Sequence, residues 1–244
     1  PEVSTFAGSG VAGSTNGTGT AAMFRGPMGT TTDGTNLYVA EYSNHRIRKI
    51  VISTGVVTTL AGSSAGYLDH TTGTSAKFDS PSGITTDGTN LYVADGNNQR
   101  IRKIVISTGV VTTLAGSDSV GSADGTGMSA SFNYPRGITT DGTNLYVADT
   151  SNHRIRKIVI STGVVTTLAG SSAGFADATT GTSAKFIGPF EITTDGTNLY
   201  VLDYNNHKIR KIVISTGVVT TLAGSSAGFA DATGTSAKFI NPSG

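Results

Sequence analysis

The sixteen residues IRKIVISTGVVTTLAG, from Ile47 to Gly62, decide the fold, because they recur three more times without a single change. The further copies run from Ile101 to Gly116, from Ile155 to Gly170 and from Ile209 to Gly224. A second string, TTDGTNLYV, begins at Thr31, Thr85, Thr139 and Thr193, so the repeat period is 54 residues. Repetition at a fixed period indicates a tandem array, in which each unit buries its apolar faces against its neighbours.

Each unit carries strand periodicity, since Leu91 and Val93 alternate with Tyr92 and Ala94. The alternation and the intervening turns predict four strands in the second unit: 83–86, 90–94, 101–106 and 110–115. Asp87-Gly88 is a strong hairpin signal, because glycine tolerates the positive φ of tight turns. No segment shows a helical stripe. The predicted fold is all-β, a β-propeller of four-stranded antiparallel blades.

The ends of the chain do not coincide with unit boundaries. We expect one propeller over 1–244, with repeat units at about 29–82, 83–136, 137–190 and 191–243 and a partial unit at 1–28. Residues 1–8 resemble a fourth strand, which we expect to be an ordered, hydrogen-bonded edge strand. Three readings follow: a window on a longer protein, pairing of this strand with another molecule, or four blades that close alone and leave it surplus.

The stretch NLYVADTSNHRIRKI, from Asn144 to Ile158, resembles the NHL repeat, whose members are β-propellers. The likeness covers every unit and extends through the TLAG ending and the following AxF…P loop. It implies relatives that bind proteins, RNA or small molecules, with a few enzymes among them, so it specifies fold rather than function.

Composition excludes several classes of function. Charged residues are 14% of the chain and the formal net charge is +1, so bulk attraction to nucleic acid or anionic lipid is not expected. The chain has no cysteine, which excludes disulfides and thiol catalysis. No signal peptide or apolar run of transmembrane length is present. Richness in Gly, Ser and Thr without Cys suggests an exported bacterial protein, extracellular or at the cell surface.

Two catalytic motifs occur, and both are read as coincidences. Gly62-Ser63-Ser64-Ala65-Gly66 and two later copies match G-x-S-x-G, but the nucleophile elbow needs a following helix. The segment 8–13 matches G-x-G-x-x-G, yet a dinucleotide site needs a helix and a distant acid in a βαβ unit. We therefore expect flexible interblade loops and no cofactor.

A polar ring recurs once per unit. The second predicted strand ends in an acid and the third begins with a base, which predicts a structural network of ion pairs. The ring residues are Glu41, Asp95, Asp149, Asp203, Arg46, Arg100 and Arg154. His45, His153 and His207 share one position and are interpreted as turn-capping or exposed residues rather than as zinc ligands. Single loop acids at Asp69, Asp124, Asp177 and Asp231 are too few for a calcium site, so no metal is expected.

Differences between units concentrate at one end of the predicted blade. The first-to-second and third-to-fourth turns are identical in all units, whereas the second-to-third turn and the interblade loop vary. Connections carry function on rigid scaffolds, which predicts binding there; drift after duplication is the alternative. The candidate contacts are Tyr42, Tyr67, Asn97, Thr150, Phe175 and Tyr204.

The sequence thus predicts a non-enzymatic scaffold or recognition protein that binds a protein partner through this face, or self-associates through its terminal strands. The alternative is a propeller-type lyase or hydrolase with a channel active site. Such an enzyme should break the repeat symmetry with polar residues, and the asymmetric positions Glu41, Gln99, Arg136 and Glu191 form no obvious acid, base and metal set. Nucleic-acid binding is not expected, because basic residues near the interblade loops are sparse.

Overall fold

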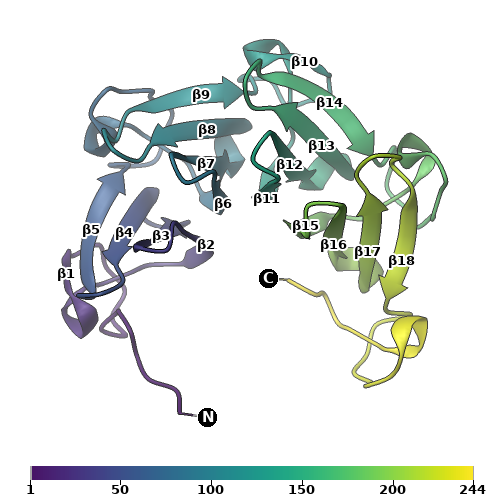
Figure 1. The fold of residues 1–244 in the computed structure, drawn as a ribbon, viewed down its shortest axis with the longest axis horizontal. Helices are drawn as coiled ribbons and strands as arrows, with labels where there is room; N and C mark the ends of the chain where they lie inside the picture. The colour runs from purple at the N-terminus through teal and green to yellow at the C-terminus, as the bar shows by residue number, and fades with distance from the viewer. Residues whose placement is uncertain (1, 244) are drawn as a thin grey trace. The chain divides into compact units, whose positions relative to one another are not determined.

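The computed structural model describes residues 2–243. Pro1 and Gly244, which belong to the predicted propeller at 1–244, lie outside the described residues. Each unit forms one antiparallel meander of four strands, in the sheet orders β2-β3-β4-β5, β6-β7-β8-β9, β11-β12-β13-β14 and β15-β16-β17-β18 (Figure 1). Short strands β1 and β10 add an edge to the first and third sheets. The predicted all-β class and four-stranded blades are confirmed.

The strand bounds follow the repeat closely. They are β1 Gly17–Thr18, β2 Pro27–Thr32, β3 Asn36–Glu41, β4 Arg46–Val51, β5 Val56–Ala61, β6 Pro81–Thr86, β7 Asn90–Asp95, β8 Arg100–Val105, β9 Val111–Ala115, β10 Gly125–Thr126, β11 Pro135–Thr140, β12 Asn144–Asp149, β13 Arg154–Val159, β14 Val164–Ala169, β15 Pro189–Thr194, β16 Asn198–Asp203, β17 Lys208–Val213 and β18 Val219–Ala223. Short 3₁₀ turns η1–η8 lie at Gly19–Ala21, Gly73–Ser75, Gly96–Asn98, Gly127–Ser129, Thr150–Asn152, Gly181–Ser183, Tyr204–Asn206 and Gly234–Ser236. No helix within residues 2–243 is long and apolar enough to cross a membrane.

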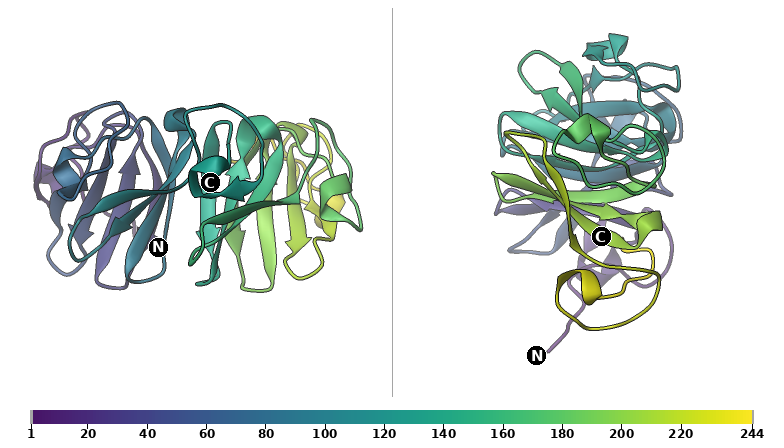
Figure 2. Two further views of the ribbon diagram at one scale, coloured as in Figure 1. Left: turned by 90° about the horizontal axis from the view of Figure 1, so that it is seen from above. Right: turned by 90° about the vertical axis from the view of Figure 1, so that its right-hand side faces the viewer.

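One end of each blade is built from invariant turns, which we call the turn end. Asp33 Oδ1 accepts hydrogen bonds from the amides of Thr35 and Asn36 at 2.8 and 2.7 Å, which closes the DGTN turn. The Ile52 amide donates to the Thr35 carbonyl at 3.0 Å, so the third-to-fourth turn lies beside it. Figure 2 shows the strands running between turns at the two ends of each sheet.

The other end, which we call the loop end, joins the second-to-third turn to the interblade loop. Asn44 Nδ2 donates to the Gly13 carbonyl at 2.7 Å, and Asn98 Nδ2 donates to the Gly66 carbonyl at 2.8 Å. These bonds tie each turn to the loop that enters its own blade. The structure therefore places the variable segments at one end, as predicted.

The chain divides into two compact units, Pro1–Thr113 and Leu114–Gly244, each with two blades. In the first unit Tyr38, Ala40 and Ile47 of the first blade pack in one cluster with Phe78 and Leu91 of the second. The corresponding cluster of the second unit contains Tyr146, Ala148, Ile155, Phe186 and Leu199. Within each compact unit, the two blades are held together by the apolar faces that the repeat leaves on each sheet.

Glycine at the third position of the inner strand permits close contact between blades. A Cβ on Gly29 would lie 2.5 Å from the Ser82 carbonyl oxygen, and a Cβ on Gly137 would lie 2.7 Å from the Glu191 Cα. Neither distance is possible for a real Cβ. The close contact between inner strands β2 and β6, and that between β11 and β15, therefore requires these glycines.

The predicted edge strand near the N-terminus is wrong for residues 2–8, which form no strand. Val3 is 95% exposed, and the first backbone contact is the Gly8 amide donating to the Gly19 carbonyl at 3.1 Å. The edge of β5 is occupied instead by β1, with Gly17 paired to Val57 and Thr18 to Val56. The local sequence of a fourth strand is insufficient where no third strand is available to pair with it.

Candidate functional site

The polar ring is a set of buried arginine networks, and the second blade shows its pattern. Arg102 Nη1 donates to Asp95 Oδ2 at 2.7 Å and to the Lys77 carbonyl at 2.9 Å. Arg102 Nη2 donates to Asp69 Oδ1 at 2.6 Å and to the Leu68 carbonyl at 3.0 Å. One guanidinium thus binds its own blade through Asp95 and the interblade loop through three oxygens.

The same network recurs in the other three blades. The buried pairs are Glu41 with Arg48 at 2.9 Å, Asp149 with Arg156 at 2.9 Å and Asp203 with Arg210 at 2.8 Å. The acids are those predicted, but the arginine that pairs with them is the third residue of the third strand rather than the first. Side chains two residues apart lie on the same side of a strand, so both arginine positions face the side of the acid; the third-position arginines are the ones that pair with it, and they are fully buried.

The first-position arginines have other partners. Arg46 donates to the Ser63 carbonyl at 3.2 Å, Arg100 to the Asn98 carbonyl at 2.9 Å and Arg154 to the Ser122 carbonyl at 3.2 Å. These hydrogen bonds also stabilise the turns and interblade loops at the loop end. In the first three blades the third-position arginine pairs with the acid, and the first-position arginine donates to backbone carbonyls.

The loop acids belong to these networks. Asp69, Asp124 and Asp177 pair with Arg102, Arg156 and Arg210 at 2.6, 2.8 and 2.7 Å. In the first blade Asn16 takes this place and accepts from Arg48 at 2.9 Å. Within residues 2–243 no group of three or more acid or histidine side chains could hold a metal ion.

Burial dominates the electrostatics of three ring acids, Asp95, Asp149 and Asp203. Desolvation raises the pKa of Asp95 to about 6, against the opposing effects of the Arg102 charge and the Asn98 hydrogen bond. Burial likewise raises the pKa of Asp149 and of Asp203. A phenylalanine ring lies against each buried guanidinium, as with Phe78 at 4.9 Å from Arg102, whereas the loop acid Asp69 on the other side of Arg102 stays partly exposed.

The histidines cap the loop end. His45 has a φ of 55°, and its Nδ1 accepts a hydrogen bond from the Ser80 amide at 3.1 Å. His153 accepts from the Gly188 amide at 3.1 Å and His207 from the Asn241 amide at 3.2 Å. Each histidine joins its turn to the start of the next repeat.

The six candidate binding residues all lie at the loop end, but several contribute to the fold. Asn97 Nδ2 donates to Asp79 Oδ1 and Ser80 Oγ at 3.1 Å, and Thr150 Oγ1 donates to the Pro189 carbonyl at 2.8 Å. Tyr42 is half-buried.

Of the aromatic residues among these six, Tyr67 and Phe175 are the exposed ones, at 39% and 50%. The Arg100 guanidinium lies 3.8 Å from the centre of the Tyr67 ring. Phe175 lies over Lys208 at 4.7 Å and over Arg210 at 4.9 Å. Each ring therefore covers an arginine network on one face and offers solvent the other.

A stack of aromatic and arginine side chains is found in the compact unit Leu114–Gly244. Arg136 lies 4.6 Å from the Tyr134 ring and 4.4 Å from the Phe190 ring, and Phe190 stacks on Tyr204 at 5.2 Å. All four side chains are half-buried at the loop end. Sequence reasoning missed Phe190 and Tyr134; the signal was the fourth inner strand, which reads PFE where the others read PMG, PSG and PRG.

Glu191 is the most marked departure from the repeat, because it replaces the glycine of the inner strand. Burial raises its pKa, and its Oε1 accepts only a long bond of 3.3 Å from the Ile192 amide. Of the other asymmetric positions, Glu41 belongs to an arginine network and Arg136 to the stack. Ser64, the serine at the centre of the G-x-S-x-G match, is an exposed residue of an interblade loop.

The geometry defines a β-propeller made of repeated four-stranded blades. A family model for the NHL repeat matches residues 132–158. NHL repeat-containing protein 2 from Homo sapiens is 33% identical over 167 residues, which are 60% of this chain and 22% of that protein. The chain is a member of the NHL-repeat family, and it spans about a fifth of the length of this curated relative.

Solved structures share the fold at low sequence identity. An auxiliary nutrient binding protein from Bacteroides ovatus matches with a TM-score of 0.63 and 20% identity, over 83% of this chain and 50% of that one. A virginiamycin B lyase from Staphylococcus aureus matches with a TM-score of 0.51 and 19% identity, over 80% of this chain and 54% of that one. At this identity the likeness concerns fold alone.

Proposed function

We propose that this chain is a non-enzymatic, exported recognition or scaffold protein whose binding surface is the loop end. One observation carries the proposal: among near-identical repeats, the sequence differences gather at the end whose loops the buried arginine networks hold in place. A fixed framework with variable side chains keeps the entropic cost of binding low.

The chemistry of this end favours a protein or peptide partner. Tyr67 and Phe175 have exposed rings. The compact unit Leu114–Gly244 adds the stack of Tyr134, Arg136, Phe190 and Tyr204. Tyrosine, phenylalanine and arginine are enriched at protein interfaces, where they supply contact area with few rotatable bonds. A neighbour in fold named as a nutrient binding protein agrees with a binding role. Export rests on composition alone.

The alternative is a lyase or hydrolase, and the lyase among the structural neighbours shows that the fold accommodates one. Glu191 is the residue that favours it, being a buried acid that breaks the repeat. We rank it second because, within residues 2–243, the Glu191 carboxylate accepts a hydrogen bond only from the Ile192 amide, and an acid in general acid or base catalysis needs a positioned partner.

Selection from a phage-displayed random peptide library against the immobilised chain tests the proposal. Peptides that bind should lose at least about tenfold in affinity for Phe175→Ala, a loss of roughly 1.4 kcal/mol. Thr162→Ala is the matched control, because Thr162 is exposed at the turn end. Melting curves check that both variants fold. A library that yields no binder, or binders that depend on Thr162 rather than Phe175, contradicts the proposal.

A further inference from the structure

The arginine network of the first blade departs from the repeat at one position. In the other three blades the buried guanidinium pairs with two carboxylates, one from its own sheet and one from the interblade loop. Within the described residues Arg48 of the first blade pairs with one carboxylate, that of Glu41. The loop supplies instead the carboxamide oxygen of Asn16, at 2.9 Å from Arg48 Nη2. The first network is therefore one negative charge short of the pattern.

The same carboxamide presents a donor where the other loops present an acceptor. In the second blade the second carboxylate oxygen of Asp69 accepts the Thr113 amide at 3.0 Å, and the fourth blade repeats this contact. The Arg48 guanidinium can only donate, so it takes the oxygen of Asn16 and leaves Nδ2 as the counterpart of that second oxygen. An amide nitrogen does not accept hydrogen bonds, so the Thr59 amide, the counterpart of Thr113, does not gain this bond.

The sequence around Asn16 would supply the missing carboxylate by one chemical step. The first interblade loop reads NGTG from Asn16, and the third reads DGTG from Asp124. Hydrolysis of one side-chain amide would give the first loop the sequence of the third. Asn16 is also the one asparagine of the chain that is followed by glycine. Because glycine has no side chain, the backbone nitrogen of Gly17 approaches the preceding carboxamide with little steric hindrance.

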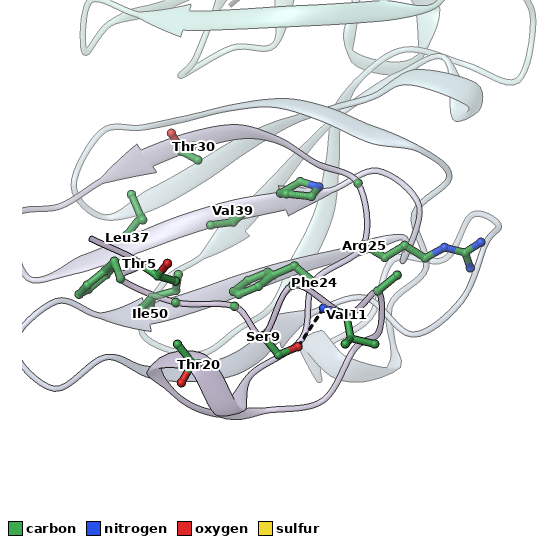
Figure 3. A pocket seen from close by; sticks show the side chains of 17 residues that line it. Thr5, Ser9, Val11, Thr20, Phe24, Arg25, Thr30, Leu37, Val39 and Ile50 are labelled. Carbon is green, nitrogen blue, oxygen red and sulfur yellow. Dashed lines mark hydrogen bonds between the residues drawn. The ribbon is translucent and has the colours of Figure 1, made fainter. Parts of the chain in front are cut away.

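Water reaches this position, because Asn16 is exposed. The exposure belongs to the repeat position, since the side chains of Asp69, Asp124 and Asp177 are 36%, 49% and 43% exposed at the same place in the other blades. It is separate from the cavity of about 1130 Å³ in the first blade, which is lined by side chains such as Phe24 and does not include Asn16 (Figure 3).

We propose that Asn16 is a site of spontaneous deamidation, which completes the arginine network of the first blade. The backbone nitrogen of Gly17 gives up its proton and forms a bond to Cγ of Asn16. The bond from Cγ to Nδ2 breaks, and ammonia leaves with that proton, so a five-membered imide ring remains. Arg48 donates to Oδ1, and its positive charge stabilises the negative charge that develops on this oxygen.

Water then opens the ring. When its hydroxyl adds to Cγ, the bond from Cγ to the Gly17 nitrogen breaks, that nitrogen takes the second proton of water, and aspartate forms with an unchanged main chain. Addition to the backbone carbonyl carbon gives isoaspartate, whose main chain carries an extra carbon. The longer chain would break the register in which β1 pairs with residues 56–57 of β5. Aspartate is the product that keeps β1 in place and provides a carboxylate for Arg48.

Peptide mapping by mass spectrometry, after incubation of the chain in mildly alkaline buffer, tests the reaction. Asn16 should convert at least about tenfold faster than Asn205, a difference of about 1.4 kcal/mol in barrier height. Asn205 is the internal control, because it is also exposed but is followed by asparagine. Fragmentation by electron transfer distinguishes aspartate from isoaspartate, and aspartate should be the main product.

Three variants test what the carboxylate does. Asn16→Asp should lower the equilibrium constant for unfolding about tenfold, because hydrogen bonds to a charged group are stronger than those to a neutral one. Asp124→Asn places an Asn-Gly pair in the third loop, so its unfolding constant should rise and then return toward wild type during incubation. Asp69→Asn is the matched control, because histidine follows it and the loss should persist.

Three outcomes would overturn the proposal. They are conversion of Asn16 no faster than that of Asn205, conversion mainly to isoaspartate, and an Asn16→Asp variant no more stable than the wild-type chain. Circular dichroism confirms the folding of each variant before incubation.

Discussion

Replacing Arg102 with methionine removes the centre of one network without removing much volume. The guanidinium and the Asp95 carboxylate are both fully buried, and the substitution leaves that acid without its cationic partner and the Lys77 carbonyl without the Arg102 donor. Removing one partner of a buried ion pair costs about 3–5 kcal/mol, because an uncompensated charge stays behind. Since a domain is stable by only about 5–15 kcal/mol, this loss is a large fraction of the total.

Unfolding in guanidinium chloride, followed by circular dichroism, measures the loss of unfolding free energy, and calorimetry measures the change in melting temperature. At about 2–4 °C per kcal/mol for a chain of this size, the melting temperature should fall by roughly 6–20 °C. Lys103→Met is the matched control on the same strand, since Lys103 is half-buried and its substitution should cost less than about 1 kcal/mol. Adding Asp95→Asn to Arg102→Met should recover part of the loss. The reasoning is refuted if Arg102→Met costs no more than Lys103→Met.

Three further predictions address other parts of the chain. Gly29→Ala should destabilise the chain by about 2 kcal/mol in urea unfolding, because its Cβ would lie 2.5 Å from the Ser82 carbonyl; a neutral result would mean that the blades separate freely. Hydrogen bonds from Asn198, Thr197 and Tyr200 lower the pKa of Asp195, so its stabilisation is present above the unfolded pKa of about 3.9 and is lost as the pH falls below it. Melting of Asp195→Asn should therefore depend less on pH than wild type below pH 4, and parallel curves would argue against this. Ser64→Ala should leave hydrolysis of p-nitrophenyl acetate at the wild-type level, since Ser64 is an exposed loop residue. Loss of activity would instead support Ser64 as the nucleophile of a G-x-S-x-G elbow.

The fold could be predicted because every 54-residue repeat carries the same local signals for strands and turns. Alternating apolar residues, the Asp-Gly turns and the identical third and fourth strands fixed the blades to within two residues at most of the bounds compared for the second unit. The N-terminal strand failed for the complementary reason: residues 2–8 carry a strand sequence, but pairing depends on a neighbour, and β1 occupies the edge of β5.

The candidate site was only partly predictable. Repetition revealed the ring acids, but Arg100 and Arg102 lie on the same side of β8, and Arg100 is directly opposite Asp95 in the register, so side-chain alternation alone did not predict Arg102 as the partner of Asp95. The loop acid Asp69 reaches Arg102 across 33 residues of sequence, a contact that no local pattern specifies. The stack at Arg136 and Phe190 joins two blades, so it emerged only from their packing.

Hydrogen–deuterium exchange at single amides tests most directly the central claim, that the arginine networks hold the loop end as a rigid surface. The decisive amides donate to the ring acids: Arg25 to Glu41 at 2.8 Å, Asp79 to Asp95 at 2.7 Å, Asn133 to Asp149 at 2.8 Å and Ile187 to Asp203 at 2.8 Å. We predict that these four loop amides exchange as slowly as the strand amides of β7, and that Arg102→Met speeds the Asp79 amide by at least about tenfold while leaving the Ile187 amide unchanged. Exchange of all four at the rate of an unstructured peptide would contradict the account.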